Sequence, residues 1–277
     1  MPGIDANQVK AVLLKIKAQK QAGKGRNNAE AFRQGIANKR EATRLLSSIV
    51  TPFTPAQVTL DTPFLIWTLR DPDAPIILVD SQIVPGGSWA KVLLSTASDD
   101  TLLGYDQVDF YFFWENSTGQ PAVVNVESFL MFDGSGNAYG HGRWLPVWFP
   151  IDTTFGNADL EIAAHLELLE WWNQPPTTPL NESGQLQSVA SVYNEGRWNL
   201  LGPSVGITKS VSGNSHVYYD TFFVPTNGVV VFMVGLGFSI FGVDGEASVD
   251  FATDPFIIIC PHLQLEIMTT SQSILTS

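Results

Sequence analysis

Residues 107–132 alternate apolar and polar side chains in two runs, and this alternation constrains the fold more than any other feature. In the first run the apolar residues are Val108, Phe110, Phe112 and Trp114; in the second they are Ala122, Val124, Val126, Leu130 and Phe132. Successive side chains of a β-strand point to opposite faces, so a period of two predicts strands with one buried face. Turn-forming residues 116–121 separate the runs. The segment therefore predicts a β-hairpin.

Similar segments recur to the end of the chain, and Pro and Gly clusters separate most of them. They predict further strands at Phe64–Thr68, Ile76–Val84, Ser88–Ser95, Leu160–Trp171, Gln187–Val192, His216–Val224, Val229–Phe241, Ala247–Phe251 and Phe256–Met268. Many short strands with turn signals are typical of antiparallel sandwiches. We therefore expect an all-β fold, an antiparallel two-sheet β-sandwich of jelly-roll-like form.

Residues 157–172 are ambiguous, because they contain good helix formers. Leu160, Ile162, Ala164, Leu166 and Leu168 nevertheless alternate with mainly polar positions. Tertiary context often overrides helix propensity, so we predict a strand here. In the last strand the same reasoning places Ile257, Ile259, Leu263, Leu265 and Ile267 inward.

A weak internal repeat relates residues 109–134 to residues 220–245, with seven identities in twenty-six positions. The shared pattern is Asp before an aromatic strand, an Asn turn, an apolar strand and then Asp-Gly. It predicts that one hairpin is used twice, either in two halves of one sandwich or in tandem sandwiches at 60–175 and 185–270. We favour one body, residues 51–277, because neither half alone has many strands.

Residues 1–50 form a separate basic arm. Residues 1–47 hold ten of the fifteen Lys and Arg residues and three acidic residues, a net charge of +7; the other 230 residues hold five basic and twenty-four acidic groups, a net charge of −19. Apolar positions at helical spacing predict helices over 6–20 and from Asn27 or Asn28 to about Ser48. A Pro/Thr-rich link at 51–55 separates arm from body.

The arm has several candidate partners. Its basic residues, which we predict to contact a partner, are Lys10, Lys15, Lys17, Lys20, Lys24, Arg26, Arg33, Lys39, Arg40 and Arg44. They could bind nucleic acid phosphates, an anionic membrane surface or the acidic body of a neighbouring copy. The third partner uses only charges present in this chain, and we favour it. A solvated helical face is the alternative that needs no partner.

Motifs of catalysis or metal binding are not found in the sequence. It has no Walker loop, no Gly-x-Ser-x-Gly and no His-Glu-x-x-His, so we expect no enzyme activity, no cofactor and no metal. His165 and His262 should be solvated on outward strand faces, and Asp133–Asn137 should be a hairpin turn. The acidic pairs at 71/73 and 99/100 are read as solvated loops. The single cysteine, Cys260, lies in an apolar run and should be buried and inert.

Tryptophans in two segments support an alternative function. Trp171 and Trp172 adjoin amide side chains, and Trp144 and Trp148 lie in a second aromatic loop. Planar side chains beside amides can stack on sugar rings, so these residues are candidates for carbohydrate binding. In a strand, Trp171 and Trp172 would point to opposite faces, so at least one should be in the core.

The layout of basic helical arm, Pro hinge and β-sandwich is similar in plan to small viral coat proteins. The resemblance is at the level of fold and implies self-assembly. We therefore predict a non-enzymatic structural protein whose arm and aromatic strand edges mediate association of copies. The expected assembly is capsid-like, another particle or a filament. The sequence also predicts a soluble protein, cytoplasmic or in an assembled particle, without signal peptide or membrane span. Asn116 and Asn181, each in an Asn-X-Ser/Thr sequence, are read as turn residues.

Overall fold

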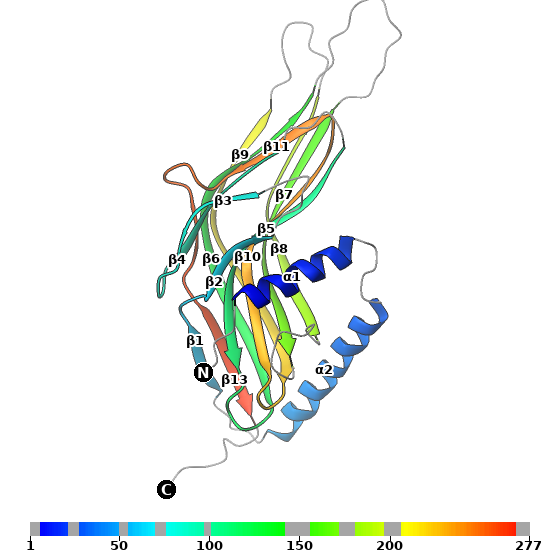
Figure 1. Ribbon diagram of the computed structural model, residues 1–277, viewed down its shortest axis with the longest axis vertical. Helices are drawn as coiled ribbons and strands as arrows, with labels where there is room; N and C mark the ends of the chain where they lie inside the picture. Colours follow the sequence, from blue (N-terminus) through cyan, green and yellow to red (C-terminus); the bar gives the residue numbers. More distant parts are fainter. Residues whose placement is uncertain are drawn as a thin grey trace, which may run out of the picture.

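Two antiparallel sheets and two N-terminal helices make up the fold (Figure 1). The computed structural model describes residues 6–21, 28–49, 55–69, 76–96, 101–141, 156–171, 181–196 and 206–269. The elements are α1 Ala6–Gln21, α2 Asn28–Ser48, β1 Ala56–Leu60, β2 Leu65–Leu69, β3 Ile76–Gln82, β4 Ser88–Thr96, β5 Thr101–Glu115, β6 Ala122–Gly140, β7 Asn157–Trp171, β8 Asn181–Glu195, β9 Ile207–Val224, β10 Val229–Val243, β11 Gly245–Asp250, β12 Ile257–Cys260 and β13 Leu263–Thr269. The predicted all-β sandwich with a helical arm is confirmed.

The chain passes repeatedly between the two sheets. Eight-stranded sheet A has the order β1-β13-β6-β11-β4-β12, with β3 beside β4 and β9 beside β6; five-stranded sheet B has the order β2-β5-β10-β7-β8. From β4 to β11 the chain changes sheet at every step except β7 to β8. The orders β4-β11-β6-β9 and β5-β10-β7-β8 define a jelly roll. Because β10 lies between β5 and β7, and β11 between β4 and β6, the two sequence halves share both sheets.

The hairpin predicted at 107–132 is wrong, because β5 lies in sheet B and β6 in sheet A. Two strands that each need one buried face can pair in one sheet or face each other across a core, and alternation does not distinguish these cases. The repeated corner, between β9 and β10, also crosses from one sheet to the other. The two corners meet: the Asn116 N–H donates to the Gly228 carbonyl (2.9 Å) and the Asn227 N–H to the Asn116 carbonyl (3.0 Å). The repeat thus marks two adjacent corners.

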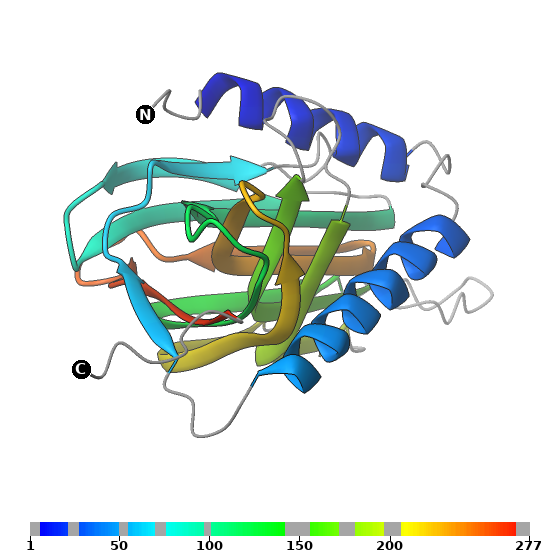
Figure 2. The same ribbon diagram turned by 90° about the horizontal axis from the view of Figure 1, so that it is seen from below.

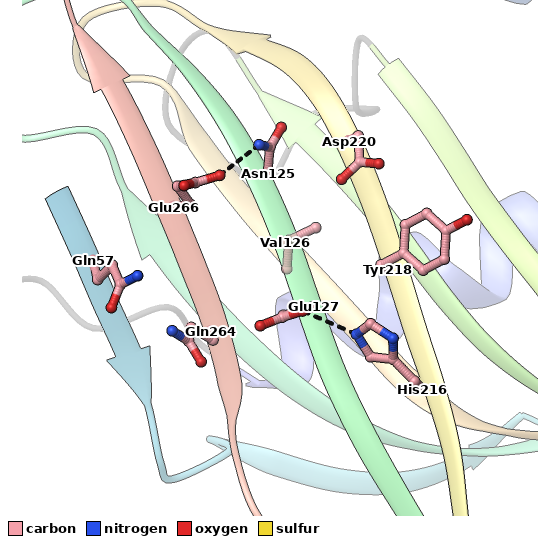
Figure 3. Close-up of a pocket in the computed structure, with 9 residues that line it drawn as sticks. All are labelled: Gln57, Asn125, Val126, Glu127, His216, Tyr218, Asp220, Gln264 and Glu266. Atoms are coloured by element: carbon pink, nitrogen blue, oxygen red, sulfur yellow. Dashed lines mark hydrogen bonds and ion pairs between the residues drawn. The ribbon is translucent and has the colours of Figure 1, made fainter. Parts of the chain in front are cut away.

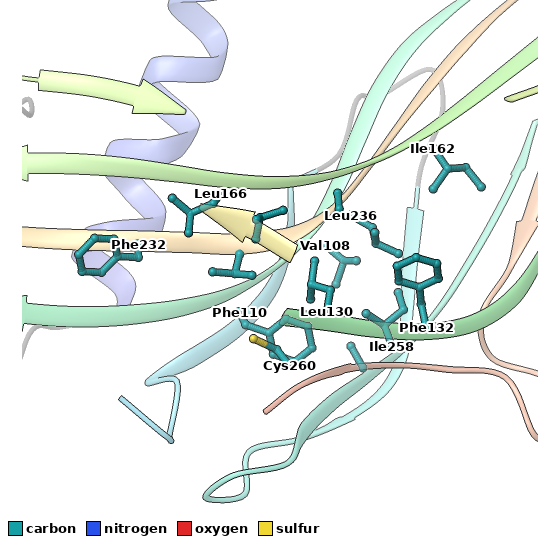
Figure 4. Packing of buried hydrophobic residues seen from close by; sticks show 14 of the residues in the cluster. Val108, Phe110, Leu130, Phe132, Ile162, Leu166, Phe232, Leu236, Ile258 and Cys260 are labelled. Atoms are coloured by element: carbon teal, nitrogen blue, oxygen red, sulfur yellow. The ribbon is translucent and has the colours of Figure 1, made fainter. Parts of the chain in front are cut away.

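The core lies between the sheets and is filled by the inward rows of their strands (Figure 4). The inward residues predicted for β5 and β6 are all buried in it. So are the five apolar alternating residues of β7, and the predicted strand is confirmed over Asn157–Trp171. The Asp133–Asn137 turn is wrong, because these residues continue β6. The prediction that Ile257 and Ile259 point inward is wrong, because Ile258 and Cys260 are the buried residues of β12. A break at 261–262 shifts the alternation by one, so Leu263, Leu265 and Ile267 are buried as predicted.

Both helices pack on the sandwich, as seen from below in Figure 2. Helix α1 lies on the outer face of sheet B, where Val12 and Leu13 join a buried cluster with Tyr111, Trp171 and Met233. Helix α2 lies against the lower end of β6 and β9. Its buried residues Ala42 and Leu45 contact Val123 and Phe223. The apolar stripes of the arm therefore meet the body of the same subunit. Neither described helix is long and apolar enough to cross a bilayer.

Asn38 fixes helix α2 to the edge of strand β9. Its side-chain oxygen accepts from the Phe223 N–H (2.9 Å), and its amide nitrogen donates to the Phe223 carbonyl (2.9 Å) and to Glu170 Oε2 (3.1 Å). Asn38 is buried, and so is Glu170. The side chain thus satisfies two backbone groups that a neighbouring strand would otherwise satisfy.

Replacing Asn38 by Ala should lower the free energy of unfolding by about 2–4 kcal/mol, because it leaves buried groups of Phe223 and Glu170 without these hydrogen bonds. Urea unfolding followed by circular dichroism would measure the change. The exposed neighbour variant Lys39→Ala is the control, with an expected change within about 0.5 kcal/mol. Equal effects of the two substitutions would contradict the role given to Asn38.

Candidate functional site

A polar groove of about 320 Å³ lies on the outer face of sheet A (Figure 3). Strand β6 contributes Asn125 and Glu127, β9 contributes His216, Tyr218 and Asp220, and β1 and β13 contribute Gln57, Gln264 and Glu266. Glu127 Oε2 lies 2.9 Å from His216 Nε2, and Asn125 donates to Glu266 (2.7 Å). The groove is lined mainly by carboxylates and amides, and no Lys or Arg of the described part of the chain lines it.

Exposed apolar side chains border this groove toward the β9 edge of the sheet. The Phe129 and His216 rings stack with centroids 4.5 Å apart, and Tyr218 lies 5.6 Å from His216. Met131 follows Phe129 on the same outward face of β6, and Leu186 of β8 lines a second depression with His216 and Tyr218. We call Phe129, Met131, Leu186 and Tyr218 the β9-edge surface. Leu186 is 65% exposed, the largest value among the large apolar residues that the structure describes.

The opposite edge of sheet A carries a second apolar surface. Strand β3 pairs with β4 alone among the described strands, and Ile77 lies opposite Leu93 in that pairing. Ile77, Val79 and Leu93 are exposed, and Ile77 is 56% exposed. We call these three residues the β3-edge surface. Exposed apolar residues beside an unpaired strand edge favour association with another chain.

The basic residues of the arm whose side chains the structure describes lie at separate places on the two helices. On helix α2, Lys39, Arg40 and Arg44 line an outward depression, and Arg44 forms an exposed ion pair with Glu41 (2.8 Å). On helix α1, Lys15 is exposed and the Lys10 ammonium lies 5.6 Å from the centroid of the Trp67 ring. The side chains of Lys17, Lys20 and Arg33, and all of Lys24 and Arg26, lie outside what the structure describes. Three exposed basic side chains of α2 thus lie together on its outward side.

The proposed tryptophan platform is only partly described. Trp171 is 1% exposed and packs under α1, so it presents no face to a ligand. This fits the expectation that one of the adjacent pair belongs to the core. Trp144, Trp148 and Trp172 lie outside the described residues, as do the acidic pairs at 71/73 and 99/100.

A buried polar cluster on sheet B corrects the prediction that His165 is solvated. His165 and Asp109 are 0% exposed, and His165 Nε2 lies 2.5 Å from Asp109 Oδ1. The other carboxylate oxygen, Oδ2, accepts from Gln107 Nε2 (2.6 Å) and from the Tyr111 hydroxyl (3.1 Å). Burial, followed by the charge of Asp109, raises the pKa of Tyr111 well above its usual value, so the phenol stays neutral. His262, by contrast, is partly exposed.

Gly235 makes this cluster possible. In register, Gly235 of β10 lies between Asp109 of β5 and His165 of β7. A Cβ there would meet the Val108 carbonyl oxygen at 1.9 Å and Asp109 Oδ1 at 2.6 Å. The bare backbone lets two side chains meet across the strand between them. A glycine inside an apolar strand signals such a close approach, and this was the available sequence clue to the cluster.

Chemistry elsewhere in the described residues is limited. No described group of three or more His, Cys, Asp or Glu residues is placed to hold a metal ion. Cys260 is fully buried, as predicted, and burial raises the pKa of its thiol to about 12. The Asn116 side chain is buried and donates to three carbonyls at the corner, so it is a structural turn residue.

No protein-family model and no curated protein sequence matches this chain. Among solved structures, one that is similar is the carbohydrate-binding module TmCBM61 in complex with β-1,4-galactotriose. It is 11% identical, the match covers 76% of this chain and 91% of that chain, and the TM-score is 0.19. A TM-score this low carries no functional argument.

Replacing Gly235 by Ala should destabilise the protein by about 3 kcal/mol or more, or prevent folding, because the methyl group overlaps backbone and Asp109. Expression in soluble form and thermal unfolding would measure this. Gly87→Ala is the matched control, because a Cβ at Gly87 meets nothing within 4 Å. A Gly235→Ala protein as stable as the control would show that the cluster is not built as described.

Proposed function

We propose that this protein is a non-enzymatic structural protein whose copies assemble through opposite edges of sheet A. The observation that carries the proposal is the presence of two different exposed apolar surfaces at opposite edges of sheet A, the β3-edge surface and the β9-edge surface, the second of which also includes Leu186 of strand β8 from sheet B. When the β3-edge surface of one copy contacts the β9-edge surface of another, the pair still has one free β3-edge surface and one free β9-edge surface. Repetition of this contact then produces a ring if the rotation between neighbours closes, and a filament if it does not.

The basic arm contributes to this association through charge. Helix α2 directs Lys39 and Arg40 outward, while the groove of Figure 3 is lined by Glu127, Asp220 and Glu266. Attraction between the cationic helix of one copy and the acidic body of the next supports particle formation and steers the encounter. Binding of nucleic acid phosphates by the same helix is the other partner that these charges suit.

A carbohydrate-binding function is the second candidate, on different residues from the tryptophans. The groove of sheet A combines the half-exposed Tyr218 ring with the amides of Gln57 and Gln264 and with carboxylates, which together can stack on a sugar and bind its hydroxyls. We prefer assembly to sugar binding as the function, because sugar binding in the groove would leave the exposed β3-edge surface without a role.

Single lysine substitutions at the two edges should separate the copies. Ile77→Lys and Leu186→Lys each place a charge in one apolar surface, so each should reduce the mass in solution toward the 30.3 kDa monomer. Light scattering would measure it. An equimolar mixture of the two variants should give dimers and nothing larger, because only the intact β9-edge surface of one and β3-edge surface of the other can still meet.

Leu14→Lys on the outer side of α1, where Leu14 is exposed, is the control and should assemble as the unmodified protein does.

Reversing charge with Lys39→Glu and Arg40→Glu should weaken assembly at low ionic strength and have less effect at high ionic strength. An unmodified protein that is monomeric at every concentration would overturn the assembly proposal.

The sugar hypothesis predicts heat on titration of neutral oligosaccharides into the full chain. Tyr218→Ala should weaken the affinity about tenfold or more through loss of the stacking surface. Tyr193→Ala removes another exposed tyrosine outside the groove and should leave binding unchanged. Absence of binding across a panel of glycans would remove this candidate.

A further inference from the structure

The buried cluster on sheet B contains one nitrogen that the hydrogen bonds do not use. His165 Nε2 is directed at Asp109, but Nδ1 is buried with no hydrogen-bond partner among the described residues. An imidazole keeps one proton when neutral and carries two when charged. The short contact to Asp109 holds a proton at Nε2, so the proton that enters or leaves His165 is the one at Nδ1.

The surroundings of His165 favour the charged form. Burial alone lowers the pKa of His165, but the charge of Asp109, the hydrogen bond to it and the charge of Glu167 outweigh burial, and the net pKa is raised. The two tyrosines near Asp109 stay neutral. Burial, followed by the charges of Glu167 and Asp109, raises the pKa of Tyr105, and burial, followed by Asp109, raises the pKa of Tyr111. On the other elements, Trp67 of β2 lies opposite Asp109, and Lys10 of α1 lies over Trp67.

The polar cluster adjoins the apolar surface on which helix α1 packs. Tyr111 donates its hydroxyl to Asp109, and its ring belongs to the apolar cluster that receives Val12 and Leu13 of α1. The same cluster includes Leu65 of β2, which pairs with Tyr111. Only Val12 and Leu13 of the described α1 side chains are buried, so the helix depends on the shape of this surface.

We propose that the His165–Asp109 pair is a proton-operated latch that holds the outer face of sheet B in the form on which α1 packs. With Nδ1 protonated, the pair is a buried ion pair that joins β5 to β7 across Gly235. Loss of the Nδ1 proton leaves the Asp109 carboxylate buried without a countercharge, which destabilises the outer face of sheet B, including Tyr111, on which α1 packs, and so releases α1. Removing one charge of a buried pair is strongly destabilising, which supplies the driving force.

The direction of the pH effect follows from linkage. A histidine whose pKa is higher in the folded than in the unfolded protein stabilises the fold fully below its unfolded pKa, about 6.5. That stabilisation is lost as the pH rises through the folded pKa. The latch is therefore closed at mildly acidic pH and opens as the pH becomes alkaline.

The test compares the full chain with His165→Gln, which can still donate a hydrogen bond to Asp109 but does not titrate. Amide hydrogen exchange, divided by the intrinsic rate at each pH, reports protection of α1 at pH values from about 6 to about 9. Protection of α1 in the unmodified protein should fall by up to about tenfold for each pH unit between the two pKa values. In His165→Gln it should already be low at acidic pH and should not change across this range.

Val231→Ala is the control for simple destabilisation, because it removes apolar contact from the same cluster and leaves every titrating group in place. It should lower protection and keep the pH dependence. If unmodified protein and His165→Gln lose protection equally with pH, the latch is wrong.

A second measurement covers failure of His165→Gln to fold. Nitrogen-15 spectra of the four histidine rings in the unmodified chain, assigned with His141→Gln, His216→Gln and His262→Gln, should show that the remaining ring, His165, stays protonated at both nitrogens above pH about 6.5. Titration of every ring at or below that value would overturn the proposal.

Discussion

Contact between the inward rows of sheets A and B is the interaction on which the rest of this structure depends. The central strand β10 is buried along most of its length, and its neighbours β5 and β7 contribute rows of Val, Leu, Ile and Phe to the same core. Burial of this apolar area fixes the spacing and orientation of the sheets. Every other feature, from the edge surfaces to the helices, is positioned by strands that enter this core.

The alternation of the sequence predicted which residues point inward but not which strands pair. The inward rows of β5, β6 and β7 follow from a period of two, because a half-buried strand must place its apolar side chains on one face. Partner choice depends on where the chain turns between sheets, and the corners at 116–121 and 225–228 resemble ordinary hairpin turns in sequence. The hairpin interpretation failed for that reason, and the repeat pointed to corners that meet in space.

The candidate sites were predicted less well, because they depend on tertiary neighbours. Outward position on a strand suggested that His165 is solvated, yet the side chain is fully buried and is paired with Asp109 of another strand. The cationic residues of the arm were identified as a group, but only the helix geometry shows which of them α2 directs away from the body. The edge surfaces could not be predicted, since an exposed Ile77 or Leu186 has the same sequence appearance as a core residue.

The attachment of Asn38 to Phe223 has a consequence for how far the β9 edge is open. An incoming strand needs free N–H and C=O groups in succession, and the amide of Asn38 already occupies those of Phe223 at the lower end. Strand addition from outside is thereby stopped before it reaches the helices. A strand added to this edge therefore cannot pair with Phe223, and α2 limits the length of edge that is open to another chain.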